Sequence, residues 1–353
     1  MDLSGQGNGQ SAPVKLGLIG LGFAGTVLHL PSLLKNQRAD LVAVSDVSDE
    51  KLAEFSSAFP GLEVDKFVDY KSIIEDKTID AVLIASPTPT HTKIAVEALA
   101  AGKHVFCEKP ISSTAEDAEL MIAESNARPH LVLMIGQVLR FWPEYVQIKK
   151  IIDDGKIGKP VIARTYRANP MPKALFYESD QLSGGVIVDL GLHDIDFLSW
   201  ALGPVSSVYA QGGNFSGRGD VIDYAQIHFN FQSGAMAYLE TNWAVPENFP
   251  FSTAVEITGT EGMIAADNTD SRASYQLTIN GQKRVTAAVS ELNGYHYEQD
   301  AFLRAVQTKS PTPIPACAAL YSLRLAIAAK ESIRTGKEVV LPKFAMPSKV
   351  AVS

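Results

Sequence analysis

Cysteine is almost absent from this sequence: only Cys107 and Cys317 occur among 353 residues. Two cysteines cannot form a disulfide framework, and a metal site built on thiolates is not expected either. Cys107 lies inside an apolar run, which is typical of a small buried hydrophobic residue rather than a reactive thiol. We therefore expect a protein of a reducing compartment, the cytoplasm.

Basic clusters and long apolar runs are also lacking. Lys and Arg number 31 against 39 Asp and Glu, a net charge of -8, and no basic stripe occurs, so we expect no nucleic-acid partner. The apolar runs are well short of the roughly 20 residues that cross a bilayer, so no membrane partner is expected. Residues 1–13 have neither the basic nor the apolar region of a secretory signal, and we predict a disordered tail.

The length predicts two domains, and the first shows short apolar runs between helical patterns. Runs without polar alternation are typical of parallel strands buried on both faces. The predicted strands are 16–19, 41–44, 81–85, 104–107 and 131–135, and the predicted helices are 90–101 and 114–127. Thr90 is a plausible N-cap of its helix, and Gly102 is placed to end it. This order predicts a Rossmann-type doubly wound α/β domain over residues 14–136.

The second predicted domain, residues 137–353, has a different pattern. Apolar and polar residues alternate over 224–231, and a second strand at 235–243 follows the turn at 232–234, which is typical of an antiparallel sheet with one face on a core. Further elements are expected at 141–154, 159–168, 295–307 and 316–335. The last two are helices that either cover the sheet or return to the first domain. We thus predict an α/β domain with a large, open, mostly antiparallel sheet, whose uncovered face forms a homodimer or homotetramer.

A glycine motif lies between the first predicted strand and a helical pattern. It reads Gly20-Leu21-Gly22-Phe23-Ala24-Gly25, the G-x-G-x-x-G fingerprint of dinucleotide-binding folds. Gly20 permits the tight turn, Gly22 lets the backbone approach a pyrophosphate, and Gly25 allows close packing of the helix, whose N-terminus favours negative charge. We expect all of these residues, with Phe23 and Ala24, at the cofactor.

Asp46 follows the second predicted strand, 21 residues after Gly25 (46 minus 25). A carboxylate at this position accepts hydrogen bonds from the adenosine ribose and repels a 2'-phosphate, so NAD is favoured over NADP. Two alternatives stay open at this point: a turn of an α/β domain without any ligand, and a FAD-binding fingerprint.

Two further loops should lie at the same edge of the sheet, where open parallel sheets bind ligands. The loop Ser86-Pro87-Thr88-Pro89-Thr90-His91 is stiffened by two prolines, and we expect Ser86, Thr88 and His91 to contact the cofactor. His91 is equally well explained as a helix-start residue without a chemical role. The next loop begins with Glu108 and Lys109, and Lys109 is a lone cation at this edge.

An acid and a base for the same site lie farther along the chain. Asp189, His193 and Asp196 have spacings of four and three, which on one helix places them on one face. His193 is the natural base for an alcohol proton, Asp189 can orient it or bind substrate, and Lys109 can stabilise negative charge on oxygen or relay the proton. A metal site of Asp189, His193 and Asp196 is the alternative, but no further His or Cys cluster supports it, and we expect no metal.

Together these motifs resemble the glucose-fructose oxidoreductase, inositol dehydrogenase and MocA (Gfo/Idh/MocA) family over about residues 14–341. The residues that carry the resemblance are Gly20-x-Gly22-x-x-Gly25, Glu108-Lys109-Pro110 and Gly184-Gly185-x-x-x-Asp189-x-Gly191-x-His193-x-x-Asp196. The resemblance implies a Rossmann domain, oligomers built through the second domain's sheet, and pyridine-nucleotide chemistry on sugars and polyols. It also implies Lys109, Asp189 and His193 as catalytic residues, with Glu108 near the nicotinamide.

The substrate is less clearly indicated. Inositol dehydrogenases typically have two adjacent arginines after the sixth strand, whereas this chain has Leu139-Arg140-Phe141-Trp142. We expect Lys109, Asp189 and His193 to contact substrate, and add Arg140, Arg167, Asn169 and Trp243 as candidates. The two arginines could equally form ion pairs, and Trp243 could equally be a core or interface residue.

The function predicted from the sequence is an NAD-dependent dehydrogenase that oxidises a secondary alcohol of an inositol-like polyol, an aldose or an anhydrosugar. One alternative is a glycosidase that oxidises its sugar transiently with NAD. An alternative of another class is a non-catalytic regulator that senses a nucleotide or sugar; such proteins usually lose the reactive Lys and His, which this chain retains.

Overall fold

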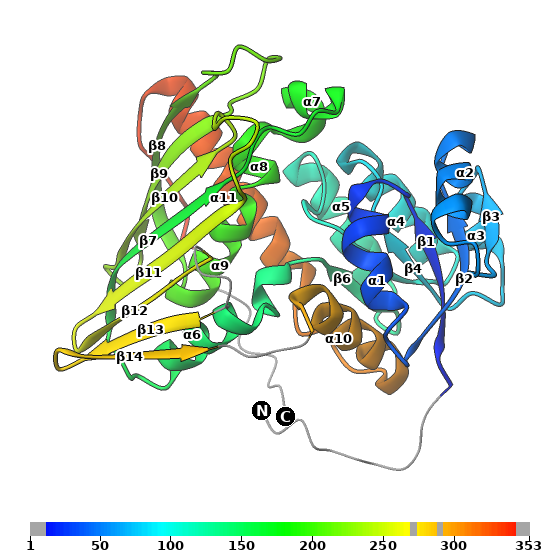
Figure 1. The fold of residues 1–353 in the computed structure, drawn as a ribbon, viewed down its shortest axis with the longest axis horizontal. Helices are drawn as coiled ribbons and strands as arrows, with labels where there is room; N and C mark the ends of the chain where they lie inside the picture. The colour runs from blue at the N-terminus through cyan, green and yellow to red at the C-terminus, as the bar shows by residue number, and fades with distance from the viewer. Residues whose placement is uncertain (1–11, 269–273, 288–291, 344–353) are drawn as a thin grey trace.

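The computed structural model describes residues 12–268, 274–287 and 292–343. Two sheets lie side by side, each with helices, and the helices of the second domain are between its sheet and the first domain (Figure 1). The disordered tail predicted for residues 1–13 falls almost entirely outside the described residues. Within the described residues, no helix is both long and apolar enough to cross a membrane.

The first sheet is parallel throughout and has the strand order β3-β2-β1-β4-β5-β6. This order confirms the predicted Rossmann domain. Its strands are β1 Val14–Ile19, β2 Ala39–Ser45, β3 Asp65–Phe67, β4 Ala81–Ile84, β5 His104–Cys107 and β6 Leu133–Ile135. Strand β3 is not predicted from the sequence, because this edge strand is three residues long and begins with two exposed charged residues.

The two helices predicted for the first domain, 90–101 and 114–127, are present as helices that are one residue shorter at each end. The helices of this domain are η1 Ala24–His29, α1 Leu30–Leu33, α2 Asp49–Ala58, α3 Lys71–Glu75, η2 Thr88–Thr90, α4 His91–Ala100 and α5 Ala115–Asn126. Thr114 caps α5 by accepting a hydrogen bond from the Asp117 amide. Thr90 does occupy the N-cap of α4, but its hydroxyl donates to the Pro87 carbonyl and makes no cap hydrogen bond.

The second sheet has nine strands in the order β14-β13-β12-β11-β7-β10-β9-β8-β15. Among the strands that the structure describes in this sheet, only β7 and β10 pair in parallel, so the prediction of a large, mostly antiparallel sheet is confirmed. The bounds are β7 Pro160–Ala168, β8 Val205–Gly213, β9 Tyr224–Phe231, β10 Met236–Asn242, β11 Ser252–Gly259, β12 Gly262–Asp267, β13 Ser274–Ile279, β14 Gln282–Ala287 and β15 Val339–Val340. In β9 and β10 alternate residues are buried, as the two-residue pattern predicts.

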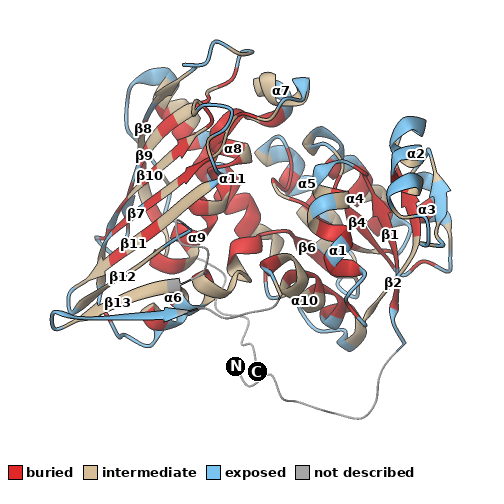
Figure 2. Cartoon of the chain, in the orientation of Figure 1, coloured by how far each residue is buried: buried red, intermediate tan, exposed pale blue. Residues whose placement is uncertain are grey.

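Helices cover one face of this sheet, and buried residues gather between the two layers (Figure 2). The remaining elements are η3 Val138–Arg140, α6 Pro143–Asp153, η4 Leu175–Glu178, α7 Asp180–Ser183, α8 Gly185–Asp189, α9 Leu192–Leu202, α10 Gly294–Thr308 and α11 Ala316–Thr335. Helix α11 packs on β8 and reaches α5, whereas α10 packs on β1, η1 and α1. The apolar residues Phe302, Leu303 and Val306 of α10 therefore belong to the core of the first domain.

Candidate active site

The glycine loop has the geometry that a dinucleotide requires. Gly20 has φ +98°, and a Cβ on it would lie 2.6 Å from the Ser86 amide nitrogen. A Cβ on Gly25 would lie 2.1 Å from the Gly20 carbonyl oxygen, so this glycine allows the helix to pack closely against the loop. A Cβ on Gly22 would meet no atom within 4 Å. Gly22 therefore faces open space, which fits the close approach of a pyrophosphate to the backbone.

Asp46 lies beside this loop at the end of β2. Its carboxylate accepts hydrogen bonds from the backbone amide of Leu21 at 2.9 Å and from that of Ser48 at 3.0 Å. These bonds fix the carboxylate at the edge of the loop, and each of its oxygens keeps lone pairs for ribose hydroxyls. The residues present thus fit a bound NAD, which would be held by Gly20 to Gly25 and by Asp46. Phe23 is exposed beside them, at 67%.

His91 stabilises the loop after β4 from inside the protein and is not exposed at the edge of the sheet. His91 is 1% exposed, with Nδ1 2.9 Å from the Pro110 carbonyl oxygen and Nε2 2.8 Å from that of Ser86. Both ring nitrogens are therefore used inside the protein, and the prediction that His91 contacts the cofactor is corrected to a structural role at the start of α4. Burial lowers the pKa of His91 even though these carbonyls oppose the shift. The Ser86 hydroxyl is hydrogen-bonded to the Thr90 hydroxyl, and Thr88 is half-buried on η2.

Lys109 and Asp189 meet across the two domains. The Lys109 ammonium donates to the backbone carbonyl of Asp189 at 2.6 Å and to its carboxylate at 3.2 Å. Lys109 follows the carboxyl end of β5, and Asp189 is the last residue of α8, where helical carbonyls lack intrahelical partners. The fold thus brings a cation and a carboxylate that are 80 residues apart to one point.

His193 belongs to the next helix, α9, and is close enough for the charge of Lys109 to act on it. Burial lowers the pKa of His193 well below its ordinary value, and the charges of Lys109 and Arg167 lower it further. Its Nδ1 atom is buried without a hydrogen-bond partner among the described residues. An imidazole in this state is unprotonated near neutral pH and is able to accept a proton.

The prediction that Asp189, His193 and Asp196 share the face of one helix is wrong. The Gly191 amide donates to the Val186 carbonyl, five residues earlier, so the helix is interrupted between α8 and α9. The Asp196 carboxylate is 2.7 Å from Arg140 and 2.9 Å from the Ser322 hydroxyl, away from the Lys109 contact of Asp189. The three residues therefore do not form the metal site considered as an alternative.

The two arginines expected at the substrate are held in ion pairs. Arg140 bonds both carboxylate oxygens of Asp196, at 2.8 and 2.7 Å, and Arg167 bonds both oxygens of Asp194, at 2.5 and 3.3 Å. Arg167 also donates to the Tyr145 hydroxyl at 3.2 Å. Both side chains are buried, so the ion-pair alternative is observed in a buried form, and a substrate contact of either arginine stays a prediction.

The remaining two substrate candidates differ. Trp243 is 1% exposed and packs edge-on against Tyr177, so it is a core residue, as its alternative interpretation held. Asn169 is partly buried after β7, and its side-chain amide donates to the Pro170 carbonyl at 2.8 Å. Its role at the substrate stays a prediction.

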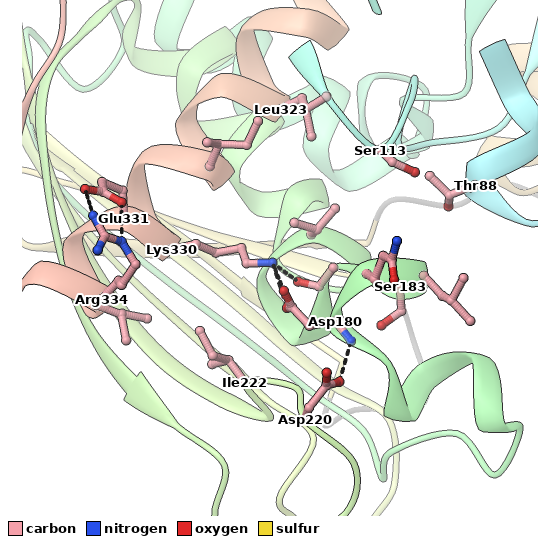
Figure 3. Close-up of a pocket in the computed structure, with 16 residues that line it drawn as sticks. Thr88, Ser113, Asp180, Ser183, Asp220, Ile222, Leu323, Lys330, Glu331 and Arg334 are labelled. Carbon is pink, nitrogen blue, oxygen red and sulfur yellow. Dashed lines mark hydrogen bonds and ion pairs between the residues drawn. The ribbon is translucent and has the colours of Figure 1, made fainter. Parts of the chain in front are cut away.

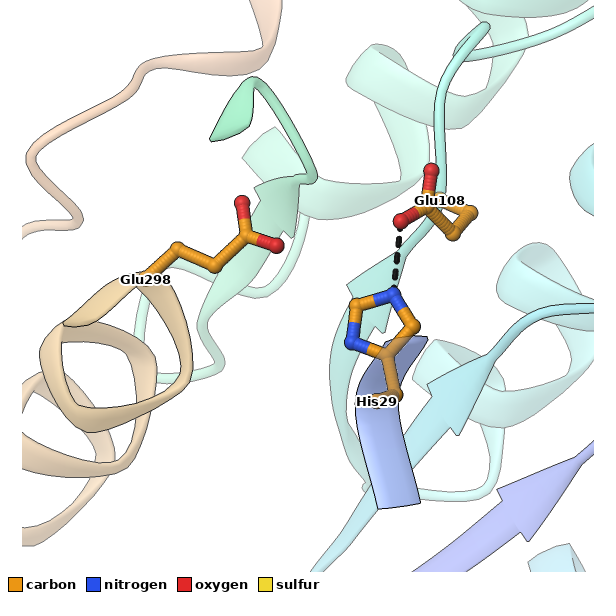
Figure 4. Close-up of side chains that lie close together, drawn as sticks. All are labelled: His29, Glu108 and Glu298. Atoms are coloured by element: carbon orange, nitrogen blue, oxygen red, sulfur yellow. Dashed lines mark hydrogen bonds and ion pairs between the residues drawn. The ribbon is translucent and has the colours of Figure 1, made fainter. Parts of the chain in front are cut away.

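A buried polar cluster beside Lys109 was missed by the sequence analysis. The Glu108 carboxylate accepts hydrogen bonds from His29 Nε2 at 2.6 Å and from the Lys109 amide at 2.8 Å, and Glu298 of α10 points toward it (Figure 4). His29 and Glu298 are each 0% exposed. The only sequence signal for His29 was a polar residue among apolar ones, four residues after Gly25, which alone does not separate a core histidine from a functional one.

A cavity of about 460 Å³ lies next to this site rather than in it (Figure 3). It is bounded by α7 and α11 and by Thr88 and Ser113 of the first domain. In the wall of the cavity, the Lys330 ammonium forms an ion pair with the Asp180 carboxylate at 2.7 Å. Lys109, Asp189 and His193 do not line this cavity. The candidate site is therefore located by the chemistry of these three side chains and not by the cavity.

This combination of features defines a class of protein. A Rossmann sheet with a glycine loop and a carboxylate at the end of its second strand, and with an ammonium, a carboxylate and an imidazole at the same edge, is the arrangement of a pyridine-nucleotide oxidoreductase. The chain belongs to the Gfo/Idh/MocA family: residues 14–136 match the oxidoreductase family with an NAD-binding Rossmann fold, and residues 145–265 match the GFO/IDH/MocA C-terminal domain. The family resemblance and NAD as the cofactor are thereby confirmed.

Several known proteins are similar over nearly the whole chain. The myo-inositol 2-dehydrogenase of Thermotoga maritima is 30% identical over 93% of this chain and 98% of its own length. The scyllo-inositol 2-dehydrogenase (NAD(+)) of Bacillus subtilis is 28% identical over 93% of this chain and 96% of its own. The crystal structure of an oxidoreductase domain protein from Kribbella flavida has a TM-score of 0.86 at 20% identity, covering 94% of this chain and 100% of that chain, which shows the common fold.

Proposed function

We propose that this protein is an NAD-dependent dehydrogenase that transfers a hydride between a secondary alcohol of a cyclic polyol or sugar and nicotinamide. The observation that carries the proposal is the contact of Lys109 with Asp189, 2.6 Å from ammonium to carbonyl oxygen, with His193 close to the same charge. These groups lie at the carboxyl edge of the Rossmann sheet, where ligands bind.

Each of the three residues has a task that its chemistry explains. The nicotinamide supplies the hydride acceptor when NAD is bound. The Lys109 ammonium has three N–H donors, and its contacts with Asp189 use two, which leaves one for the alcohol oxygen and the negative charge that develops there. Asp189 orients that ammonium. The unprotonated imidazole of His193 accepts the hydroxyl proton, with Lys109 as the second candidate for its relay.

The similarity to two inositol dehydrogenases supports a cyclic polyol as the substrate class. Arg140 stands where inositol dehydrogenases typically have a pair of arginines, and here it is bound to Asp196. This chain therefore lacks one cation of that pair, and the other is held by a carboxylate. Inositols, aldoses and anhydrosugars all remain substrates to be tested, because differences of a few contacts decide specificity.

A substrate panel tests the proposal directly. Purified protein is incubated with NAD and each of several inositols, aldoses and anhydrosugars, and the absorbance of NADH is followed. We expect stoichiometric NADH with at least one cyclic polyol or sugar, and much less reduced cofactor with NADP, since the Asp46 carboxylate repels a 2'-phosphate. Asp46→Ala should weaken NAD binding and relax the discrimination against NADP.

The Lys109→Met variant supplies the control, because it keeps the side-chain length and removes the charge. It should reduce kcat by about a hundredfold or more while NAD still binds, which calorimetry measures. Turnover that survives in Lys109→Met would reject the assignment of the site. Cleavage of a glycoside without net NADH would instead favour the transient-oxidation glycosidase, and NAD binding without any turnover would favour the regulator.

A further inference from the structure

The buried cluster behind Lys109 has no task in the proposed reaction. It consists of His29 from η1, Glu108 from the loop after β5, and Glu298 from α10, and at least one ligand atom of each lies within 4.8 Å of the others. Figure 4 shows Glu298 reaching from its helix toward the bonded pair of His29 and Glu108. Three segments far apart in the sequence thus converge on the residue that precedes Lys109.

The hydrogen bonds of the cluster run in one direction and end at the backbone of Lys109. The Gln299 side-chain amide donates to His29 Nδ1 at 2.8 Å, so Nδ1 is an acceptor and Nε2 carries the proton. His29 Nε2 then donates to Glu108 at 2.6 Å, and the other Glu108 oxygen accepts the Lys109 amide at 2.8 Å. A movement of the Glu108 carboxylate would therefore move the peptide unit that carries Lys109.

Glu298 differs from Glu108 in having no donor at all. Both of its carboxylate oxygens are buried and without a hydrogen-bond partner among the described residues. An isolated buried carboxylate is costly, whereas the protonated acid is neutral and becomes a donor itself. Burial and the negative charge of Glu108 raise the pKa of Glu298 well above its ordinary value. For Glu108, burial acts in the same direction but is outweighed by His29 and Lys109, and its pKa is lowered.

A divalent metal ion explains the cluster less well. Two ligands at tetrahedral angles on one zinc ion lie roughly 3.4 Å apart, from zinc–ligand distances near 2.1 Å. The 2.6 Å between His29 Nε2 and Glu108 is instead a hydrogen-bond distance. The other titratable neighbour of Glu298 is Tyr295 on its own helix, which burial keeps protonated by raising its pKa. A proton on Glu298 removes its buried charge without any ion.

We propose that His29 and Glu298 are positioning residues, which hold the Glu108 carboxylate and thus the backbone of Lys109, and that Glu298 does so as a neutral acid. The expected effect on turnover rests on the proposed function. The hold on the Glu108 carboxylate and the neutral state of Glu298 do not. The space around Glu108 agrees with such a hold, because a Cβ on Gly136 would lie 3.4 Å from its carboxylate oxygen. Helix α10, which carries Glu298, packs on η1, which carries His29, so the two residues come from elements in contact with each other.

The test compares Glu298→Gln with Glu298→Ala in the full-length protein. Glutamine is a neutral donor of nearly the same shape, so Glu298→Gln should retain most of the turnover. Glu298→Ala should lower kcat by about tenfold or more with little change in the polyol KM, because misplacing a catalytic group slows chemistry more than binding. Arg304→Ala, on the exposed side of α10, is the matched control. Equal kcat values in Glu298→Ala and wild type would overturn the role.

Two readouts that need no substrate separate this proposal from the proposed function. The infrared difference spectrum of wild type minus Glu298→Gln should contain the C=O stretch of a buried carboxylic acid at pH 7; only carboxylate bands would refute the neutral acid. Because the folded pKa of Glu298 is raised, its contribution to wild-type stability falls as pH rises above 4.5, so the Tm of Glu298→Gln should rise relative to that of wild type with increasing pH. One equivalent of metal in the purified protein, lost in Glu298→Gln, would replace the proposal by a metal site.

The His29 variants keep the positioning role testable if Glu298→Ala does not fold. His29→Gln retains an amide N–H near the position of Nε2, whereas His29→Leu removes the donor to Glu108. We expect kcat to fall clearly more in His29→Leu than in His29→Gln at equal NAD affinity. An equal loss in both variants, or no loss in either, would overturn the role of His29.

Discussion

At the scale of single residues, the proposed role of His193 as the base links the pH dependence of the reaction to the protonation of its imidazole. Burial and the nearby charges of Lys109 and Arg167 lower the pKa of His193 well below 6.5. An imidazole accepts a proton only when it is unprotonated, which is the case at pH values above its pKa. The lowered pKa therefore extends the active range toward acid.

We predict that the acid limb of kcat/KM for the alcohol lies below pH 6.5, the ordinary imidazole value. The measurement is the initial rate of NADH formation between pH 4.5 and 9 at saturating NAD. His193→Gln should be slow and should lack this limb. A limb at pH 6.5 or above that persists in His193→Gln would show that another group is the base.

The buried arginine–aspartate pair is a second feature of this scale. Burial disfavours the charge on Arg167, but Asp194 more than offsets it, so the pKa of the guanidinium is raised. Removing only one partner of a buried pair leaves an unpaired charge in the core, which costs about 3–5 kcal/mol. A structural role of Arg167 therefore predicts that its removal lowers stability, whereas a substrate-contact role predicts that its removal weakens substrate binding.

We predict that Arg167→Met lowers the free energy of unfolding by about 3–5 kcal/mol in denaturant titrations. Arg164→Met is the matched control: this residue of the same strand is exposed and pairs loosely with Glu256, so its loss should stay below about 1 kcal/mol. If Arg167→Met has normal stability and a greatly raised KM for the polyol, Arg167 contacts the substrate instead.

At the scale of elements, the two ends of the glycine motif serve different purposes. A Cβ at Gly25 would collide with the Gly20 carbonyl, whereas one at Gly22 would meet open space. Gly25 is thus required for folding of the loop and η1, and Gly22 is required only where a ligand approaches. The sequence motif alone does not distinguish the cost of a substitution to folding from its cost to ligand binding.

Substituting each glycine by alanine should separate them experimentally. We predict that Gly25→Ala lowers the free energy of unfolding by roughly 1–3 kcal/mol, measured without cofactor. Gly22→Ala should unfold like wild type but bind NAD about tenfold more weakly in calorimetry, a loss of about 1.4 kcal/mol. Unchanged NAD affinity in Gly22→Ala would mean that the pyrophosphate does not lie against this glycine.

The sequence predicted elements well where their periodicity was local. Strand β5, strand β9 and helix α11 have the predicted bounds because apolar spacing and a terminal glycine determine them. The interruption between α8 and α9 was not predicted from the sequence, because the packing of Gly191 against Thr241 of β10 is a tertiary contact. For the same reason the sequence did not predict the His29 and Glu298 cluster, or the carboxylates that bind Arg140 and Arg167.

At the scale of the whole molecule, the second sheet has one face without helices in the part of the chain that the structure describes. The helices that contact the sheet lie on the side of its buried residues, and Figure 2 shows exposed and half-buried residues on the other side. Ile162 and Met236 are register partners on this outer face and are 53% and 55% exposed. Neighbouring exposed apolar residues on a broad sheet are typical of a protein interface.

We predict that the outer face of the sheet forms the homo-oligomer, as a dimer or tetramer. A specific interface buries about 1,600 Å² in total, an area that a nine-stranded sheet can supply. The double variant Ile162→Lys with Met236→Lys should therefore dissociate, because it places two charges in an apolar contact. Leu120→Lys, an exposed apolar residue of α5, is the control that should leave assembly intact. Light scattering after size exclusion gives the masses, and a wild-type mass of 38.0 kDa at micromolar concentration would contradict the prediction.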